Sequence, residues 1–185
     1  QLDRVDLAAW NAWVNVPVKV RNGSGALRSW LTFDRDALSE IIADLRLSSV
    51  NAQLRGDLPE LELENVAGRV TWKQLPSGFE LSAVKLALSG AGTRLQPADF
   101  RLKMGSDDKR ARTGELYANA LELGPLVMLA DRLPLEKELR AQLVGLSPRG
   151  KLHDLVGRWK GEWPQLASYS LRGRFEALAV NRWEK

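Results

Sequence analysis

The chain has 185 residues, of which 44% are hydrophobic and 27% charged, and its net charge is +4. This length suffices for one domain with a substantial core. The absence of cysteine excludes disulfides, thiolate metal sites and cysteine nucleophiles. No apolar stretch approaches the ~18 residues of a membrane-spanning helix. The basic residues are scattered among acidic ones and form no stripe with interleaved aromatic residues, so we predict no nucleic-acid partner.

The first predicted element is a short N-terminal helix over about residues 6–15. Asp6 can cap its N-terminus, Trp10 and Trp13 lie on its apolar side, and Pro17 ends it. The sequence begins with Gln1 rather than Met, and we therefore expect a fragment of a longer protein.

Most of the remaining sequence alternates between apolar and polar residues with a period of two, which predicts β-strands. The clearest case has Leu171 and Phe175 on one face and Arg172 and Arg174 on the other. Short turns such as Pro76-Ser77-Gly78 make successive strands antiparallel neighbours. The strands are predicted at about 26–34, 39–55, 61–74, 78–89, 94–104, 113–123, 150–163 and 169–177.

The alternation changes phase within three of these strands. In the second strand the apolar positions move from odd to even numbers at Ser48-Ser49, and similar switches separate Leu63 from Val66 and Ala83 from Val84. A phase change inside a strand is what a β-bulge produces, and bulges bend strands. The predicted sheet should therefore curl.

A helical hairpin is predicted over about residues 125–146. Pro125 can occupy the first turn of one helix and Pro134 ends it. In the second helix, Glu136 and Arg140 form a favourable pair four residues apart.

One pattern occurs twice along the chain. Val5-Asp6-Leu7 leads through a helical stretch to Gly25, and Leu121-Glu122-Leu123 leads through another to Gly150. Such self-similarity indicates a repeat-built protein. We predict that residues 1–185 form a single β-rich module of it.

Eight strands present more apolar surface than about 35 helical residues can cover. The sheet could close on itself as a sandwich, or part of its apolar face could remain open. Large exposed apolar patches are uncommon on soluble monomers, which favours closure. An open face would bind an apolar ligand.

No catalytic or metal-binding pattern is present. His153 is the sole histidine, and Asp154 beside it points to the opposite face of a strand, so the two cannot form a dyad. Asp34 and Asp36 lack the further oxygen ligands of a calcium loop. We predict no enzymatic activity, no cofactor and no metal site.

The strand tryptophans allow three interpretations. They could be core residues, mark the boundary between an acyl-lined groove and water, or form a platform that stacks against sugars.

Four stretches carry a family resemblance: Val66-Ala67-Gly68-Arg69-Val70-Thr71-Trp72, Gly78-Phe79-Glu80-Leu81, Ala130-Asp131-Arg132-Leu133-Pro134-Leu135 and Leu146-Ser147-Pro148-Arg149-Gly150-Lys151-Leu152. With them, the chain resembles the periplasmic region of YhdP-type proteins. These belong to the AsmA-like group of Gram-negative envelope proteins, which are related to TamB and AsmA.

The resemblance implies a long periplasmic protein, anchored in the inner membrane, that is involved in phospholipid transport and outer-membrane biogenesis. It favours an open groove over closure. We therefore predict a mainly β fold: a long twisted antiparallel sheet curled into an open groove, or half-barrel, with a short N-terminal helix and a helical hairpin. The expected partners are phospholipid acyl chains, adjacent modules of the same polypeptide and, through regions outside these residues, the inner and outer membranes.

Acyl chains would lie on apolar positions that alternate along the strands. The predicted groove residues are Leu45, Leu47, Val70, Trp72, Leu86, Leu88, Leu102, Leu171 and Phe175. The alternative function is a structural scaffold or adaptor that supports outer-membrane assembly without binding lipid.

Overall fold

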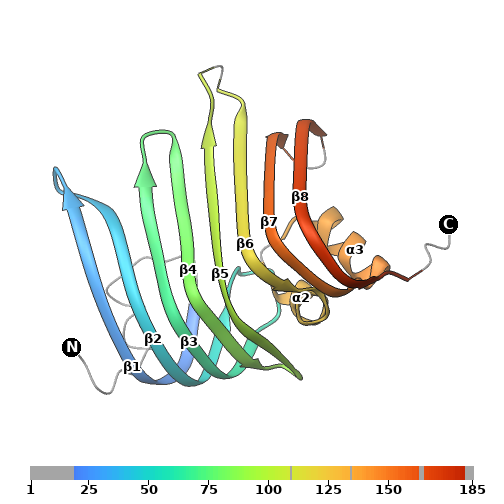
Figure 1. Cartoon of the computed structure of the whole chain (residues 1–185). Coiled ribbons are helices and arrows are strands. Elements are labelled where there is room, and N and C mark those ends of the chain that lie inside the picture. The colour runs from blue at the N-terminus through green and yellow to red at the C-terminus, as the bar shows by residue number, and fades with distance from the viewer. Residues whose placement is uncertain (1–18, 109, 134, 163–164, 182–185) are drawn as a thin grey trace.

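The computed structural model describes residues 19–108, 110–133, 135–162 and 165–181. It contains one eight-stranded antiparallel sheet in which the order of the strands follows the chain from β1 to β8 (Figure 1). The sheet is not closed into a barrel, which confirms the predicted open, mainly β fold. The strands are β1 (Lys19–Asp34), β2 (Ala37–Gln53), β3 (Leu61–Leu75), β4 (Gly78–Gly90), β5 (Thr93–Ser106), β6 (Arg112–Glu122), β7 (Arg149–Glu162) and β8 (Gln165–Ala179).

The predicted strand boundaries agree with the structure to within a few residues, except at the start of β1. This strand begins at Lys19, so Gly25 lies inside it and does not lead it. Gly150, by contrast, is the second residue of β7, as predicted. The predicted helix over residues 6–15 lies outside the described residues.

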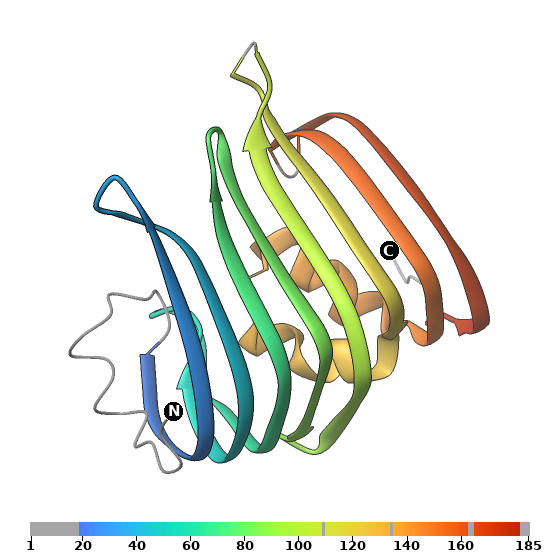
Figure 2. The same cartoon turned by 60° about the vertical axis from the view of Figure 1, so that its left-hand side comes forward.

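The predicted phase changes coincide with irregularities in strand pairing. Ser49 and Lys85 both have positive φ angles, 53° and 51°, and the register shifts beside each of them and also between Leu63 and Asn65. In β4 the switch falls one residue later than the sequence suggested, because Val84 pairs with Arg69 on the opposite face from Leu86. Figure 2 shows the strands bending so that the sheet curls.

The connection between β6 and β7 is helical. It contains α2 (Leu123–Leu129), the 3-10 turn η1 (Ala130–Arg132) and α3 (Lys137–Leu146). Helix α2 begins two residues before Pro125, which falls in the first turn, where no backbone N–H is needed. Ser147, in the left-handed conformation, ends α3. Both helices lie on the inner side of the curled sheet (Figure 2).

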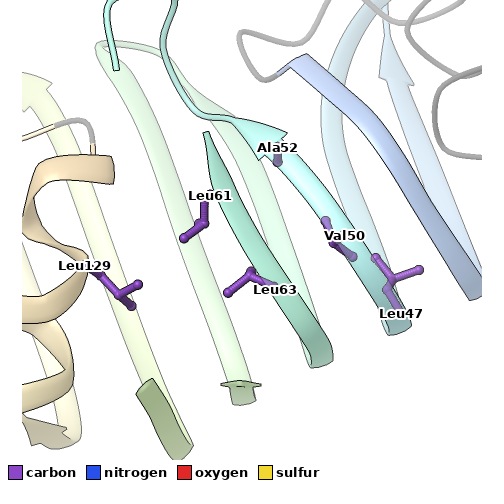
Figure 3. Packing of buried hydrophobic residues seen from close by; sticks show 6 residues of the cluster. All are labelled: Leu47, Val50, Ala52, Leu61, Leu63 and Leu129. Carbon is purple, nitrogen blue, oxygen red and sulfur yellow. The ribbon is translucent and has the colours of Figure 1, made fainter. Parts of the chain in front are cut away.

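Two clusters of buried apolar residues join α2 to the sheet. The first, which we call the helix-covered core, combines Leu129 of α2 with five residues of β2 and β3: Leu47, Val50, Ala52, Leu61 and Leu63 (Figure 3). The second combines Leu123 of α2 with Ala118, Leu152 and Leu155 of β6 and β7. Helix α2 thus packs on both halves of the sheet near the bent ends of its strands.

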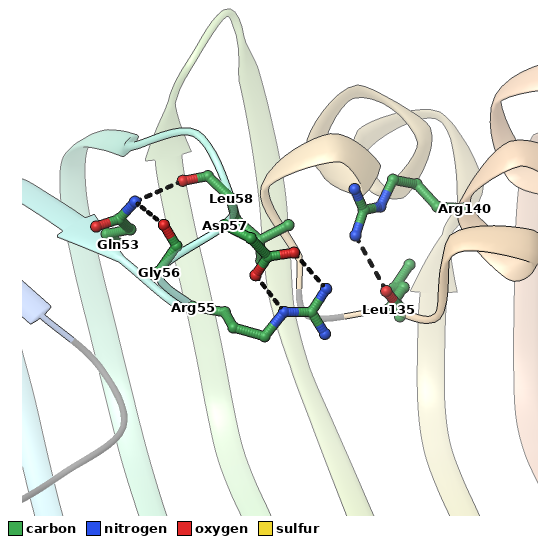
Figure 4. Close-up of polar contacts among 7 residues, drawn as sticks. All are labelled: Gln53, Arg55, Gly56, Asp57, Leu58, Leu135 and Arg140. Carbon is green, nitrogen blue, oxygen red and sulfur yellow. Dashed lines mark hydrogen bonds and ion pairs between the residues drawn. The ribbon is translucent and has the colours of Figure 1, made fainter.

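The loop between β2 and β3 is ordered and packs near the helical segment (Figure 4). The side-chain amide of Gln53 donates to the carbonyl oxygen of Leu58 at 2.8 Å, and Leu58 is only 2% exposed. Arg132 Nε donates to the carbonyl oxygen of Glu60 at 3.2 Å. The β2–β3 loop and the helical segment cover one end of the inner face. They do not cover the opposite strand ends, at the connections from β1 to β2, β3 to β4, β5 to β6 and β7 to β8. We call these ends the tips.

Candidate functional site

The strand register places an unbroken line of residues on the inner face of the sheet. Paired residues of adjacent strands lie on the same face, so the successive pairings identify the residues of all the strands that share the inner face. We call this line the apolar row: Leu31, Ile41, Trp72, Leu81, Leu102, Leu116, Gly157 and Leu171. It crosses all eight strands without a polar side chain.

Two parallel rows flank the apolar row. On the side of the helices is the buried row, Ala43, Val70, Ala83, Phe100, Ala118 and Leu155, of which Ala83, Ala118 and Leu155 are 1%, 3% and 4% exposed. On the side of the tips is the tip row, Phe79, Met104, Gly114, Trp159 and Tyr169. The inner face is therefore apolar over several rows, and its burial decreases towards the tips and towards β8.

All nine predicted groove residues lie on this inner face, but their burial differs. Leu47 belongs to the helix-covered core, and Leu45 and Leu88 pack against it. Leu171 and Phe175 are 62% and 58% exposed on β8. The remaining four are half-buried: Val70, Trp72, Leu86 and Leu102. The accessible part of the predicted groove therefore excludes the positions under α2.

Sequence reasoning missed much of the inner face. Leu31 and Phe33 of β1, which are 46% and 61% exposed, were not predicted to line a groove, nor were Leu81 and Leu116. The same alternation that identified Leu171 also marks these residues. What the sequence lacked was the register, which shows that Leu31, Leu81 and Leu116 belong to one row across neighbouring strands.

The outer face is charged directly behind the apolar row. One line of paired residues alternates in charge across six strands, and we call it the charge row: Glu40, Lys73, Glu80, Lys103, Glu115 and Arg158. Arg158 Nε lies 3.3 Å from Glu115 Oε1. Opposite charges on adjacent strands stabilise their pairing, and a face of this composition is suited to water.

A second outer-face feature is the ion pair of Arg69 with Asp44. Arg69 Nη2 donates to Asp44 Oδ2 at 2.9 Å, and the ring of Trp30 lies 5.7 Å from the same guanidinium. The hydrogen bond from Arg69, aided by its positive charge, lowers the pKa of the Asp44 carboxyl below its usual value.

The two residues of β7 that the sequence analysis considered for catalysis, His153 and Asp154, contact side chains of β8. His153 Nε2 lies 2.8 Å from Glu176 Oε2, whereas Asp154 accepts a hydrogen bond from Arg174 at 2.6 Å. Among the described residues, no group of three or more histidine, aspartate or glutamate side chains could hold a metal ion. Within the same residues, no helix has both the length and the apolarity to cross a membrane. The prediction that the chain has no enzymatic activity remains a prediction.

Comparison with known proteins supports the resemblance noted in the sequence. The chain matches the family described as YhdP protein over residues 1–185. No curated protein and no solved structure matches it. With its open β-sheet groove and this match over the whole sequence, the chain belongs to the YhdP protein family, within the AsmA-like group of envelope proteins.

Proposed function

We propose that this chain is one section of a periplasmic conduit that carries phospholipids between the inner and outer membranes, within a protein anchored to the inner membrane. The observation that supports this proposal is the apolar row, which runs from one edge of the sheet to the other. Membership of an envelope-protein family agrees with it.

The interaction with lipid is hydrophobic and weakly selective. Burial of apolar surface contributes about 25 cal/mol per Å² and has no preferred direction. An acyl chain that leaves Leu102 for its neighbour Leu116 exchanges one apolar contact for another. Movement along the row therefore costs little, whereas a site built from hydrogen bonds would retain the lipid.

The helices restrict where the lipid can lie. Because α2 and the β2–β3 loop cover the bent strand ends, the accessible apolar surface is the half of the inner face nearer the tips together with the inner face of β8, where Phe175 is exposed. Adjacent modules would continue this surface beyond β1 and β8.

The deciding experiment places a charge on the accessible surface. In Leu102→Asp, the desolvation of a carboxylate opposes the passage of acyl chains. Because Leu102 is only half-buried, the fold should survive, with the melting temperature lowered by about 4–8 °C or less. Bound phospholipid, measured by mass spectrometry after extraction, should fall by about tenfold.

Two matched variants complete this experiment. Ser82→Asp introduces the same group on the outer face, opposite Arg101, and should change neither lipid content nor stability. Leu47→Asp buries the carboxylate in the helix-covered core and should unfold the chain. Folded protein that never contains lipid would refute the conduit and favour a scaffold or adaptor.

A further inference from the structure

The repeated pattern in the sequence has a counterpart in the strand pairing. Three consecutive pairs follow Gly25 where β1 meets β2, and three follow Gly150 where β7 meets β8. The pairs are Ala26 with Arg46, Leu27 with Leu45 and Arg28 with Asp44 in the first case, and Lys151 with Glu176, Leu152 with Phe175 and His153 with Arg174 in the second. The two pairings therefore have the same spacing from their glycines.

The two glycines also make the same close approach to the neighbouring strand. A Cβ on Gly25 would collide with the carbonyl oxygen of Arg46. A Cβ on Gly150 would lie 2.6 Å from the carbonyl oxygen of Glu176, which has the position of Arg46 in the second pairing. Both glycines have positive φ angles. Strand β8 thus lies against β7 as β2 lies against β1.

This correspondence assigns counterparts in β2 to two apolar residues of β8. Phe175 has the position of Leu45, and Leu178 has the position of Leu47, the next inner-face residue of β2. Ala177, with a φ of 50°, is an extra residue in β8, since the register between β7 and β8 shifts beside it. The shift places Leu178 on the same inner face as Phe175.

The burial of these counterparts differs. Leu47 is 7% exposed in the helix-covered core, to which Leu129 of α2 also belongs, and Leu45 packs against this core. Phe175 and Leu178 are 58% and 48% exposed. Neighbouring apolar side chains that remain exposed mark interaction sites. The bent end of β8 therefore has the apolar residues of the helix-covered core without the helix.

We propose that Phe175 and Leu178 form a docking surface for a helix of the same kind as α2, contributed by an adjacent module of the same polypeptide. In this chain the covering helix follows β2 after four further strands, β3 to β6, because it belongs to the connection that leaves β6. A repeat-built protein that continues this order places its next covering helix four strands after β8.

The chemistry of the docking helix follows from α2. The sequence of α2, Leu-Gly-Pro-Leu-Val-Met-Leu, has no charged side chain, and its last residue, Leu129, enters the helix-covered core. The partner is therefore a short, uncharged helix rich in leucine. It covers the bent end of β8, whereas Leu171, nearer the tips, stays accessible. This inference does not depend on whether the sheet binds lipid.

Labelling of single cysteines tests the docking, since the chain contains no cysteine of its own. Leu178→Cys should react with a maleimide about tenfold more slowly in the full-length polypeptide than in residues 1–185 alone. Leu171→Cys is the matched control, because Leu171 is an exposed residue on the same face of β8, and its rate should differ by less than about threefold. Equal rates for Leu178→Cys in the two proteins would overturn the proposal.

Cross-linking identifies the occupant. With a photoreactive aromatic residue in place of Phe175, the full-length polypeptide should form a cross-link to a leucine-rich helix of its own sequence, which mass spectrometry of the digested product identifies. A cross-link to phospholipid alone would contradict the docked helix while supporting the conduit. A cross-link between two copies would also contradict the docked helix, and it would leave the conduit to the lipid measurement on Leu102→Asp.

Discussion

At the scale of single residues, the close approach of neighbouring strands depends on glycine at particular positions. Gly25 has a φ of 141° and its missing Cβ would collide with the carbonyl oxygen of Arg46 in β2. Gly150 has a φ of 107°, and a Cβ there would lie 2.6 Å from the carbonyl oxygen of Ala177 in β8. Both conditions exclude other residues, since L-amino acids with a side chain rarely adopt this conformation. These are also the two glycines that mark the repeated pattern in the sequence.

We expect Gly25→Ala to destabilise the chain by about 1–3 kcal/mol, because it introduces backbone strain in addition to a collision with β2. Urea unfolding monitored by tryptophan fluorescence measures the loss. Gly56→Ala is the control, since a Cβ at Gly56 meets nothing within 4 Å. Equal midpoints for the two variants would show that β1 can move away from β2 at no cost.

The Asp44–Arg69 pair should make a small, pH-dependent contribution to stability. Because folding lowers the pKa of Asp44 below 3.8, the contribution is present above that value and is lost as the pH falls through the folded pKa. The melting temperature of the parent chain should exceed that of Asp44→Asn at neutral pH, and the two should converge as the pH falls through the lowered pKa of Asp44. High salt should reduce the neutral-pH difference. A difference that is constant from neutral to strongly acidic pH would contradict this account.

At the scale of elements, the two faces of the sheet fix the strand pairing by different means. The inner rows would lose burial if a strand slipped by one residue, since every apolar side chain would move to the outer face. A slip of two residues would keep the apolar side chains on the inner face. It would, however, separate the opposite charges that the charge row places on adjacent strands, and the loss of these attractions opposes it. Within this row, Lys73 lies between Glu40 and Glu80. The charge row thus specifies register on the face that the apolar residues do not reach.

Replacement of Lys73 by glutamate should convert two favourable cross-strand pairs into two repulsive ones. We expect Lys73→Glu to lower the free energy of unfolding by about 1 kcal/mol, measured by chemical denaturation. Lys73→Gln, which removes the attraction without adding repulsion, should cost less. Added salt should bring the two variants together, because Lys73 is exposed and its charge is screened. A charge-reversed variant as stable as the parent at low salt would mean that the row has no role in pairing.

At the scale of the whole molecule, the sheet has two edges and its stability is uneven. Each inner strand pairs on both sides, whereas β1 and β8 each pair with a single described strand. Nearly all residues of β8 are exposed. Strands with few buried contacts open locally at low free energy.

Hydrogen exchange should therefore be slowest in β4 and β5 and fastest in β8. Mass spectrometry of exchanged peptides measures this gradient, and dilution provides the control, since edge strands also pair with strands of other copies. Protection of β8 that equals that of β4 at the lowest concentration would contradict an open edge.

Much of the fold was accessible from the sequence. The period of two located every strand because each strand has one apolar and one polar face, as Leu171 and Arg172 illustrate. The phase change at Ser48-Ser49 predicted a bulge because an inserted residue shifts the alternation. Pro125 and Pro134 located the helical connection, since proline restricts where a helix begins and ends.

The burial of the candidate site could not be predicted in the same way. Leu47 and Leu102 have the same local pattern, yet only Leu47 is buried under α2, because burial depends on where a connection far along the chain packs. The tip row depends on register across five strands, and the contact of Trp159 with Gly114 joins residues 45 positions apart. Alternation gives the face of a residue but not its neighbours.

The sequential strand order also determines how the molecule can change in length. Because every strand pairs with its neighbours along the chain, an added hairpin extends the sheet without altering any existing register. Adjacent strands are about 4.8 Å apart, so these eight strands span about 34 Å and each further hairpin adds about 10 Å. A gene that gains or loses hairpin segments can therefore match its product to the separation of two fixed surfaces in steps of about 10 Å.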